Sequence, residues 1–240
     1  MRASGLIDHY YPQSKKIAAP ETVLIIMNPA IFEYAKRRIW ARSRPKLPVK
    51  VTMPHKWFNG PSLLGNIGVG GVSVVAHLEY LAAWGVRQVV LIGTAGGLKP
   101  SIGYGDVVIA SKALRDDGVS IHYLPEAKWA MPSEKLNLKL TQSLEAIKPT
   151  VHLEPVWTTS APFRETKAEV RDYAAEGAVA VEMEAASLFA AAQHLGITAA
   201  AVLVISDSLA TGTHQIAPQP KIIKKTQQTV CDQLIKSFPK

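Results

Sequence analysis

Five short runs of β-branched and other apolar residues constrain this chain most, because none of them alternates regularly between apolar and polar positions. Runs of this kind are typical of strands that are covered on both faces of a sheet. They occupy residues 23–27, 89–93, 106–110, 178–182 and 201–205. We therefore expect a sheet that is buried on both sides.

Segments with helical periodicity lie between these runs, at residues 31–41, 72–84, 165–175, 184–195 and 218–238. Strands that alternate with helices predict an α/β fold. We expect a sandwich in which helices cover a central mixed, mainly parallel sheet. The chain has 240 residues and no break in composition, so we expect residues 1–240 to form a single domain.

The formal net charge of +8 raises the question of nucleic-acid binding, because clustered Lys and Arg neutralise phosphates. Much of the excess lies at residues 36–50 and in the tail from Lys221 onward, without the interleaved aromatic residues of a single-strand binder. No recognised nucleic-acid motif accompanies it. We expect no nucleic-acid partner, since a solvated helix face or attraction of small anionic substrates explains the charge as well.

No apolar run reaches the roughly 20 residues that a membrane-spanning helix needs, and residues 1–16 lack the apolar stretch of a secretory signal. These features predict a cytoplasmic protein without a membrane partner. Cys231 is the only cysteine, so it cannot form an internal disulfide or build a zinc site. We expect an inert thiol and no metal site.

Polar residues follow three of the predicted strands, at the edge where ligands collect in α/β sheets. The segment GTAGG at residues 93–97 follows one strand and carries little side chain. It can bring backbone N–H groups and the Thr94 hydroxyl close to an anion or a sugar. A tight turn that needs positive φ explains the same glycines without a ligand.

Met183 and Glu184 lie where a second apolar strand passes into an Ala-rich helix, directly after Glu182. A carboxylate at a strand end can accept hydrogen bonds from both hydroxyls of a ribose. We assign this role to Glu184, with Met183 packing on the sugar face. Acidic residues also stabilise a helix N-terminus, which explains at least one of the two glutamates without a ligand.

Asp207 follows the apolar run at residues 199–205, so we expect it to emerge from a deeply buried strand. A carboxyl group in apolar surroundings tends to have a raised pKa, which suits a residue that donates a proton near neutral pH. Protonation of a purine at N7, as its bond to ribose breaks, is one such task. The alternative is that Ser206 or Asp207 caps a following turn.

Three segments together resemble the uridine and purine nucleoside phosphorylases of the nucleoside phosphorylase and nucleosidase superfamily. The first, at residues 68–125, contains the GTxG turn, the GDVVI strand and the RxDGxSxHYxP loop. The segments VEMEAASLFAAA and VISDSLATG are similar to the later ribose and purine motifs, in the family's order. The resemblance implies an enzyme with one α/β domain, assembled into homo-oligomers, either dimers or hexamers, whose sites are shared between subunits.

The resemblance also implies roles for four residues of these segments. Thr94 matches the family's hydroxyl that touches phosphate and ribose. Met183 and Glu184 match its ribose binders. Asp207 matches the proton donor of the purine-cleaving members, whereas uridine phosphorylases lack an aspartate there.

Three further residues receive roles with competing explanations. His9 matches a histidine that reaches the ribose of a neighbouring subunit in uridine phosphorylases, and a surface position near the N-terminus is the alternative. Phe163 and Arg164 fall where the family places base-facing residues, which predicts stacking by Phe163 and edge recognition by Arg164. Core packing of Phe163 and solvation of Arg164 are the alternatives.

The chain departs from the family at the phosphate site. Phosphorylases carry one arginine in a GDPxR segment after the first strand and another three residues before the matching threonine. Here Ile31 and Leu91 stand at these positions. A third arginine, lent by the neighbouring subunit, corresponds to Lys56, a cation without the bidentate fork of arginine.

We expect the chain to cleave the N-ribosidic bond of a nucleoside, by phosphorolysis of a purine nucleoside to free base and ribose 1-phosphate. Inorganic phosphate is then the co-substrate, held by Lys56, Thr94 and backbone donors, and no cofactor is needed. The missing arginines leave hydrolysis by a nucleosidase open, and the central block leaves uridine cleavage open. A nucleoside-binding homologue that has lost turnover is the rival outside the enzymes.

Overall fold

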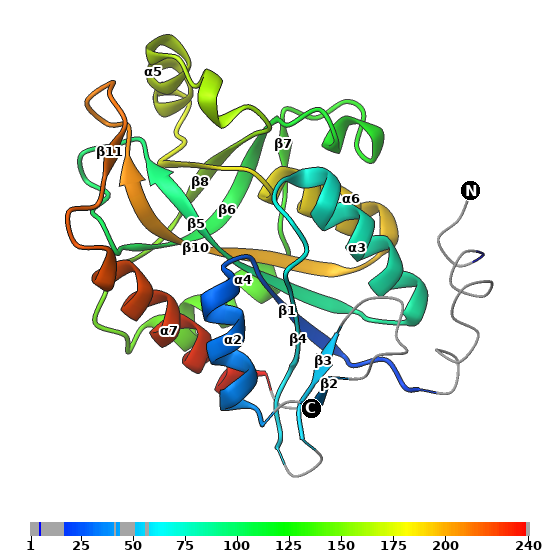
Figure 1. Ribbon diagram of the computed structural model, residues 1–240. Coiled ribbons are helices and arrows are strands. Elements are labelled where there is room, and N and C mark those ends of the chain that lie inside the picture. The colour runs from blue at the N-terminus through cyan, green and yellow to red at the C-terminus, as the bar shows by residue number, and fades with distance from the viewer. Residues whose placement is uncertain (1–4, 6–16, 41, 44–50, 56–57, 239–240) are drawn as a thin grey trace.

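The computed structural model describes residues 5, 17–40, 42–43, 51–55 and 58–238 (Figure 1). Among these residues, eleven strands belong to one mixed sheet that has helices on both sides. The strands are β1 (Thr22–Ile26), β2 (Arg42–Ser43), β3 (Thr52–Met53), β4 (Ser62–Gly65), β5 (Gln88–Gly97), β6 (Val107–Asp116), β7 (Trp129–Ala130), β8 (Val151–Thr159), β9 (Ala180–Glu182), β10 (Thr198–Ser208) and β11 (Gln215–Ile216). The helices are α2 (Pro29–Arg38), α3 (Gly71–Trp84), α4 (Glu134–Leu144), α5 (Lys167–Ala175), α6 (Ala185–Leu195) and α7 (Pro220–Ser237), with short 3₁₀ helices η2 (Ser120–His122) and η3 (Pro162–Arg164). The predicted α/β fold around a mixed sheet is confirmed.

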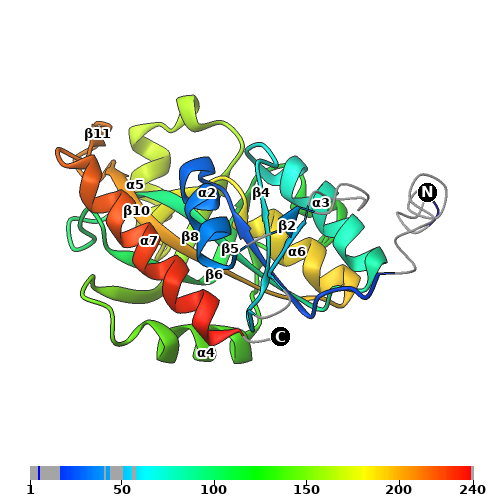
Figure 2. The ribbon, with the colours of Figure 1, turned by 60° about the horizontal axis from the view of Figure 1, so that its bottom comes forward.

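The central strands are buried on both faces, as their unbroken apolar sequences predict. In β1, Val23 and Ile25 pack into one core while Leu24 and Ile26 pack into the other. Helices α3 and α6 cover the first face, and α2, α4 and α7 cover the second (Figures 1 and 2). Each side chain of this size that is fully buried stabilises the fold by roughly 1.5–3 kcal/mol.

The sheet closes on itself, which the sequence analysis did not predict. β5 pairs with β1 and β10 in parallel and with β9 in antiparallel orientation. Because β10 also pairs with β6, β6 with β8 and β8 with β9, these strands form a closed ring. Outside the ring, the sheet continues from β5 through β1, β4, β3 and β2, each paired with the one before it. The closure brings the carboxyl ends of β5 and β9 against the end of β10.

Several helices start at side-chain caps or end at glycines. Asn28 caps α2 through its side-chain oxygen. Thr166 and Glu169 form a capping box, so α5 begins after Thr166 rather than at residue 165 as predicted. Gly85 and Gly196 adopt the left-handed conformation that ends α3 and α6.

Cys231 lies in α7 and is fully buried. Burial raises the pKa of its thiol to about 12, so the reactive thiolate is scarce near neutral pH. This environment supports the prediction of an inert thiol. In the part of the chain that the structure describes, no helix is both long and apolar enough to cross a lipid bilayer.

Candidate active site

A pocket with a volume of about 380 Å³ opens where β1, β5, β9 and β10 end. Four of the predicted site residues line this pocket together, namely Thr94, Met183, Glu184 and Asp207. We call it the main pocket. Its residues come from distant parts of the sequence, and the closed ring of strands brings them to one place.

The GTAGG segment is part of β5, which corrects the prediction of a loop or tight turn after the strand. β5 runs to Gly97, and its glycines are absent from the residues with positive φ. Thr94 is exposed to the pocket side, whereas its neighbours in the strand are buried. At Gly96, a Cβ atom would lie 2.9 Å from Asp207 Oδ2, so glycine is needed here for the close approach of β10.

The two glutamates at the start of α6 have separate tasks. Glu182 Oε2 accepts hydrogen bonds from the backbone N–H groups of Glu184 and Ala185, both at 2.8 Å. The Thr158 hydroxyl donates to Glu182 Oε1 and accepts the Ala186 N–H at 2.9 Å. Glu182 is therefore the residue that stabilises the N-terminus of α6, which leaves Glu184 for the pocket.

Glu184 connects two loops that border the main pocket. Its Oε1 accepts a hydrogen bond from the Gly70 N–H at 2.6 Å, directly before α3. Burial raises the pKa of Glu184 above its ordinary value. Burial also raises the pKa of Glu182, and the neighbouring Glu184 raises it further. The pair therefore places buried, closely spaced carboxyl groups beside the pocket.

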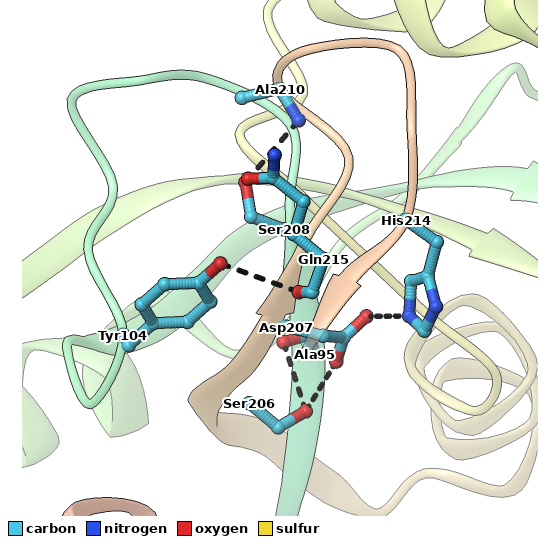
Figure 3. Close-up of polar contacts among 8 residues, drawn as sticks. All are labelled: Ala95, Tyr104, Ser206, Asp207, Ser208, Ala210, His214 and Gln215. Atoms are coloured by element: carbon cyan, nitrogen blue, oxygen red, sulfur yellow. Dashed lines mark hydrogen bonds and ion pairs between the residues drawn. The ribbon is translucent and has the colours of Figure 1, made fainter. Parts of the chain in front are cut away.

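Asp207 lies in β10, after a bulge that shifts the strand register between Ile205 and Asp207. In a regular strand, the side chains of Asp207 and Ile205 would point to the same face, and Ile205 packs in a core. The extra residue of the bulge turns the Asp207 side chain away from that core. The side chain is 23% exposed, and its oxygens contact the Ser206 hydroxyl at 2.5 Å and His214 Nε2 at 2.8 Å (Figure 3). The expectation of deeply apolar surroundings is wrong, because both carboxylate oxygens have polar partners.

A second pocket of about 360 Å³ adjoins the main pocket and shares Pro162, Glu165 and Asp207 with it. We call it the adjoining pocket. Phe163 lines it with a fully exposed side chain, which disfavours the alternative of core packing. Arg164 is exposed and lines neither pocket, in line with the solvated alternative.

Glu165 lines both pockets, and the sequence analysis missed it. Burial raises the pKa of its carboxyl to about 6, and the negative charge of Asp207 adds to the increase. The sequence offers only a weak signal for Glu165, a carboxylate at the start of a predicted helix and next to the segment that holds Phe163 and Arg164.

Among the residues that the structure describes, no Lys or Arg lines the main pocket. Ile31 and Leu91, which replace the family's arginines, are fully buried in the two cores. The charged residues that line the pocket are all acidic: Glu165, Glu182, Glu184 and Asp207. Lys56 and His9 lie outside the described residues. Within those residues, no cluster of three His, Cys, Asp or Glu could hold a metal ion.

The segment at residues 115–125, which runs from the end of β6 through η2, holds α6 in place. Asp117 accepts hydrogen bonds from the Ser120 N–H at 3.0 Å, from the Ser120 hydroxyl at 2.6 Å and from the Ser187 hydroxyl of α6. Arg115 Nε donates to the Ser120 hydroxyl at 2.9 Å. Because all of these groups are buried or nearly so, the loop positions the helix that begins beside Glu184.

The fold is that of the nucleoside phosphorylases. The crystal structure of uridine phosphorylase from Vibrio fischeri ES114 matches with a TM-score of 0.79 at 18% sequence identity, over 92% of each chain. At this identity the likeness establishes the fold alone. The family is established by the sequence. The chain belongs to the phosphorylase superfamily, whose sequence model matches residues 47–236.

This chain is similar to relatives that are named after different substrates. A guanosine phosphorylase from Halorubrum lacusprofundi is 29% identical over 148 residues, which is 62% of this chain and 61% of that protein. The uridine phosphorylase of Escherichia coli K12 is 28% identical over 182 residues, which is 70% of each protein. The matches thus span between three fifths and seven tenths of these relatives. The chain therefore belongs to the phosphorylase superfamily and has a fold shared with nucleoside phosphorylases.

Proposed function

We propose that the chain cleaves a purine nucleoside by phosphorolysis, releasing the free base and ribose 1-phosphate. The observation that supports this most is the joint position of Thr94, Met183, Glu184 and Asp207 in the main pocket of a phosphorylase-superfamily protein. The main pocket and the adjoining pocket together have a size that suits a nucleoside and a small anion.

Each of these residues has a chemical task in the proposed reaction. Glu184 accepts hydrogen bonds from the ribose hydroxyls, and Met183 packs against the sugar. The Thr94 hydroxyl donates to the phosphate or to the ribose. Asp207 donates a proton to N7 of the purine while the C1′–N9 bond breaks, so the base leaves as a neutral molecule. The carboxylate of Glu184 also stabilises the positive charge that develops on the ribosyl group.

A nucleoside panel tests the reaction and the base preference. Inosine, guanosine, adenosine and uridine are incubated with the protein, with and without phosphate, and free base is measured. We expect the purine nucleosides to be cleaved faster than uridine. Asp207→Asn should lower kcat on them by about 10²–10⁴-fold while KM changes little. A uridine preference unaffected by this substitution would replace the purine proposal, and release of no base would leave the nucleoside-binding homologue.

Hydrolysis is a second candidate, because the lining residues that the structure describes include four acidic groups and no Lys or Arg. An acidic pocket disfavours a phosphate anion and favours a neutral water as the ribosyl acceptor. The two reactions leave different sugars. Phosphate-dependent release with ribose 1-phosphate as product supports phosphorolysis, whereas phosphate-independent release with free ribose supports a nucleosidase.

We also propose that the chain works as a homo-oligomer, dimer or hexamer, in which Lys56 and His9 complete a neighbour's pocket. A cation from another subunit would supply the charge that Ile31 and Leu91 do not. Light scattering gives the oligomeric state. Mixed oligomers of Lys56→Ala and Asp207→Asn subunits should regain part of the phosphorolytic activity, because some pockets then contain both native residues. No recovery after confirmed subunit mixing would argue against shared sites.

A further inference from the structure

His214 is held against Asp207 by the hairpin that joins β10 to β11. Its Nε2 lies 2.8 Å from Asp207 Oδ2, while the Ser206 hydroxyl contacts Asp207 Oδ1 at 2.5 Å (Figure 3). No sequence motif assigns a role to His214. The pairing arises only because Asp207 faces Ile216 across the two strands, which brings the residues just before β11 over the carboxyl group.

The hairpin is tied down on several sides, so this contact does not depend on one flexible side chain. Gly212 turns the chain with φ of +74°, a conformation that favours glycine. The Leu209 N–H donates to the Gly97 carbonyl at 2.8 Å, and the Tyr104 hydroxyl donates to the Gln215 carbonyl at 3.4 Å. These contacts hold the backbone of the hairpin beside β10, where His214 meets Asp207.

The imidazole links the pocket to solvent. The His214 side chain is 57% exposed, whereas that of Asp207 is 23% exposed. His214 lines the adjoining pocket, where the other charged groups that face it are Glu165, just before α5, and Lys167 on α5. A proton can thus reach His214 from water without crossing the main pocket.

A general acid in this position has to regain its proton in every turnover. When Asp207 protonates the purine, it is left as a carboxylate inside a pocket that the leaving base still occupies. We propose that His214 is the proton relay of Asp207: the imidazolium transfers its Nε2 proton to Asp207 Oδ2, and the neutral imidazole, which keeps its Nδ1 proton, then takes up a new proton from solvent at Nε2. The relay rests on the proposed cleavage of purine nucleosides, and His214 acts through Asp207 rather than on the substrate.

The test compares two substrates that differ by a methyl group at N7 and therefore in their need for a proton. Guanosine must be protonated at N7 to leave easily, whereas 7-methylguanosine already carries the positive charge at N7. His214→Gln should lower kcat with guanosine at least about tenfold, a part of the about 10²–10⁴-fold contribution of general acid catalysis. With 7-methylguanosine, kcat should stay within about twofold of the wild type. Added imidazole should restore part of the guanosine rate.

His152→Gln is the matched control, because His152 Nε2 contacts Asp106 Oδ2 at 3.2 Å in a pair that lines neither pocket. It should change neither rate. An equal loss on both substrates in His214→Gln, or no loss on either, would overturn the relay while leaving the proposed function intact. A wild type that cleaved neither substrate would overturn the proposed function and the relay with it.

Discussion

A methyl group added at Gly96 tests how closely β5 must approach the proposed acid. A Cβ atom there would lie 2.7 Å from Leu209 Cδ1 and 2.9 Å from Asp207 Oδ2, closer than ordinary van der Waals contact. At Gly97, the next residue of the same strand, the nearest atom would be the Ile102 carbonyl oxygen at 3.4 Å. The two glycines therefore form a matched pair, one at a crowded site and one at a spacious site.

The two substitutions should differ in stability. Gly96→Ala should lower the free energy of unfolding by about 1–3 kcal/mol, the usual cost of overpacking. For a chain of this length, that corresponds to a decrease in Tm of roughly 2–12 °C. Gly97→Ala should leave Tm unchanged or raise it slightly, because alanine restricts the unfolded chain and meets only ordinary contacts in the folded one.

Activity should separate the variants further. Asp207 has to move away from an alanine at position 96, and a displacement of this kind should lower kcat on guanosine at least about tenfold. Gly97→Ala should retain most of the activity. Thermal unfolding and base release measured on both variants check these values. If the two variants lost the same stability and the same activity, the argument that Gly96 permits the approach of Asp207 would be refuted.

Three further predictions concern buried or pocket groups. Glu184→Gln should keep the fold and lower kcat/KM at least about tenfold, because one acceptor facing the ribose becomes a donor; unchanged kinetics would remove Glu184 from the site. The folded state keeps a proton on Glu182 that the unfolded chain releases near pH 4.5, because the pKa of Glu182 is raised to about 8 in the folded protein. Tm should therefore fall as pH rises from 4.5 to about 8, and it should fall less in Glu182→Gln. Cys231 should react with a thiol reagent near pH 8 at least about 10³-fold more slowly in the folded protein than after unfolding, and equal rates would contradict its burial.

Local sequence was sufficient for the elements that carry a strong pattern. The apolar runs placed β1, β5 and β10, and helical periodicity placed α3, α6 and α7 within a few residues. β8, α4 and β4 were not predicted. In the half of β8 before Val156, apolar and polar residues alternate little and the side chains are partly exposed, so the sequence pattern for a strand is weak there. Such segments become strands only because a neighbouring strand supplies hydrogen-bond partners.

The proposed sugar and acid residues were identified from short motifs, whereas their surroundings were not. Thr94, Glu184 and Asp207 stand in segments whose residue order carries the family resemblance, and the structure brings them to one pocket. His214 and Glu165 have no comparable signal. His214 contacts the carboxyl group of Asp207, and Glu165 lines the same two pockets as that carboxyl group. Both arrangements depend on how the loops before α5 and β11 fold, and no sequence spacing encodes them.

The sequence by itself determined which segments form buried strands and amphipathic helices, because backbone preference and apolar periodicity act over a few neighbouring residues. Only the tertiary structure decided that β5 and β10 meet in a closed ring and that a bulge after Ile205 turns Asp207 toward the pocket. It also decided that the side chain of Glu182, rather than that of Glu184, accepts the backbone N–H groups at the start of α6. These outcomes depend on strand register and on which buried polar groups find partners. Both are settled by contacts between distant segments, which exist only once the chain has folded.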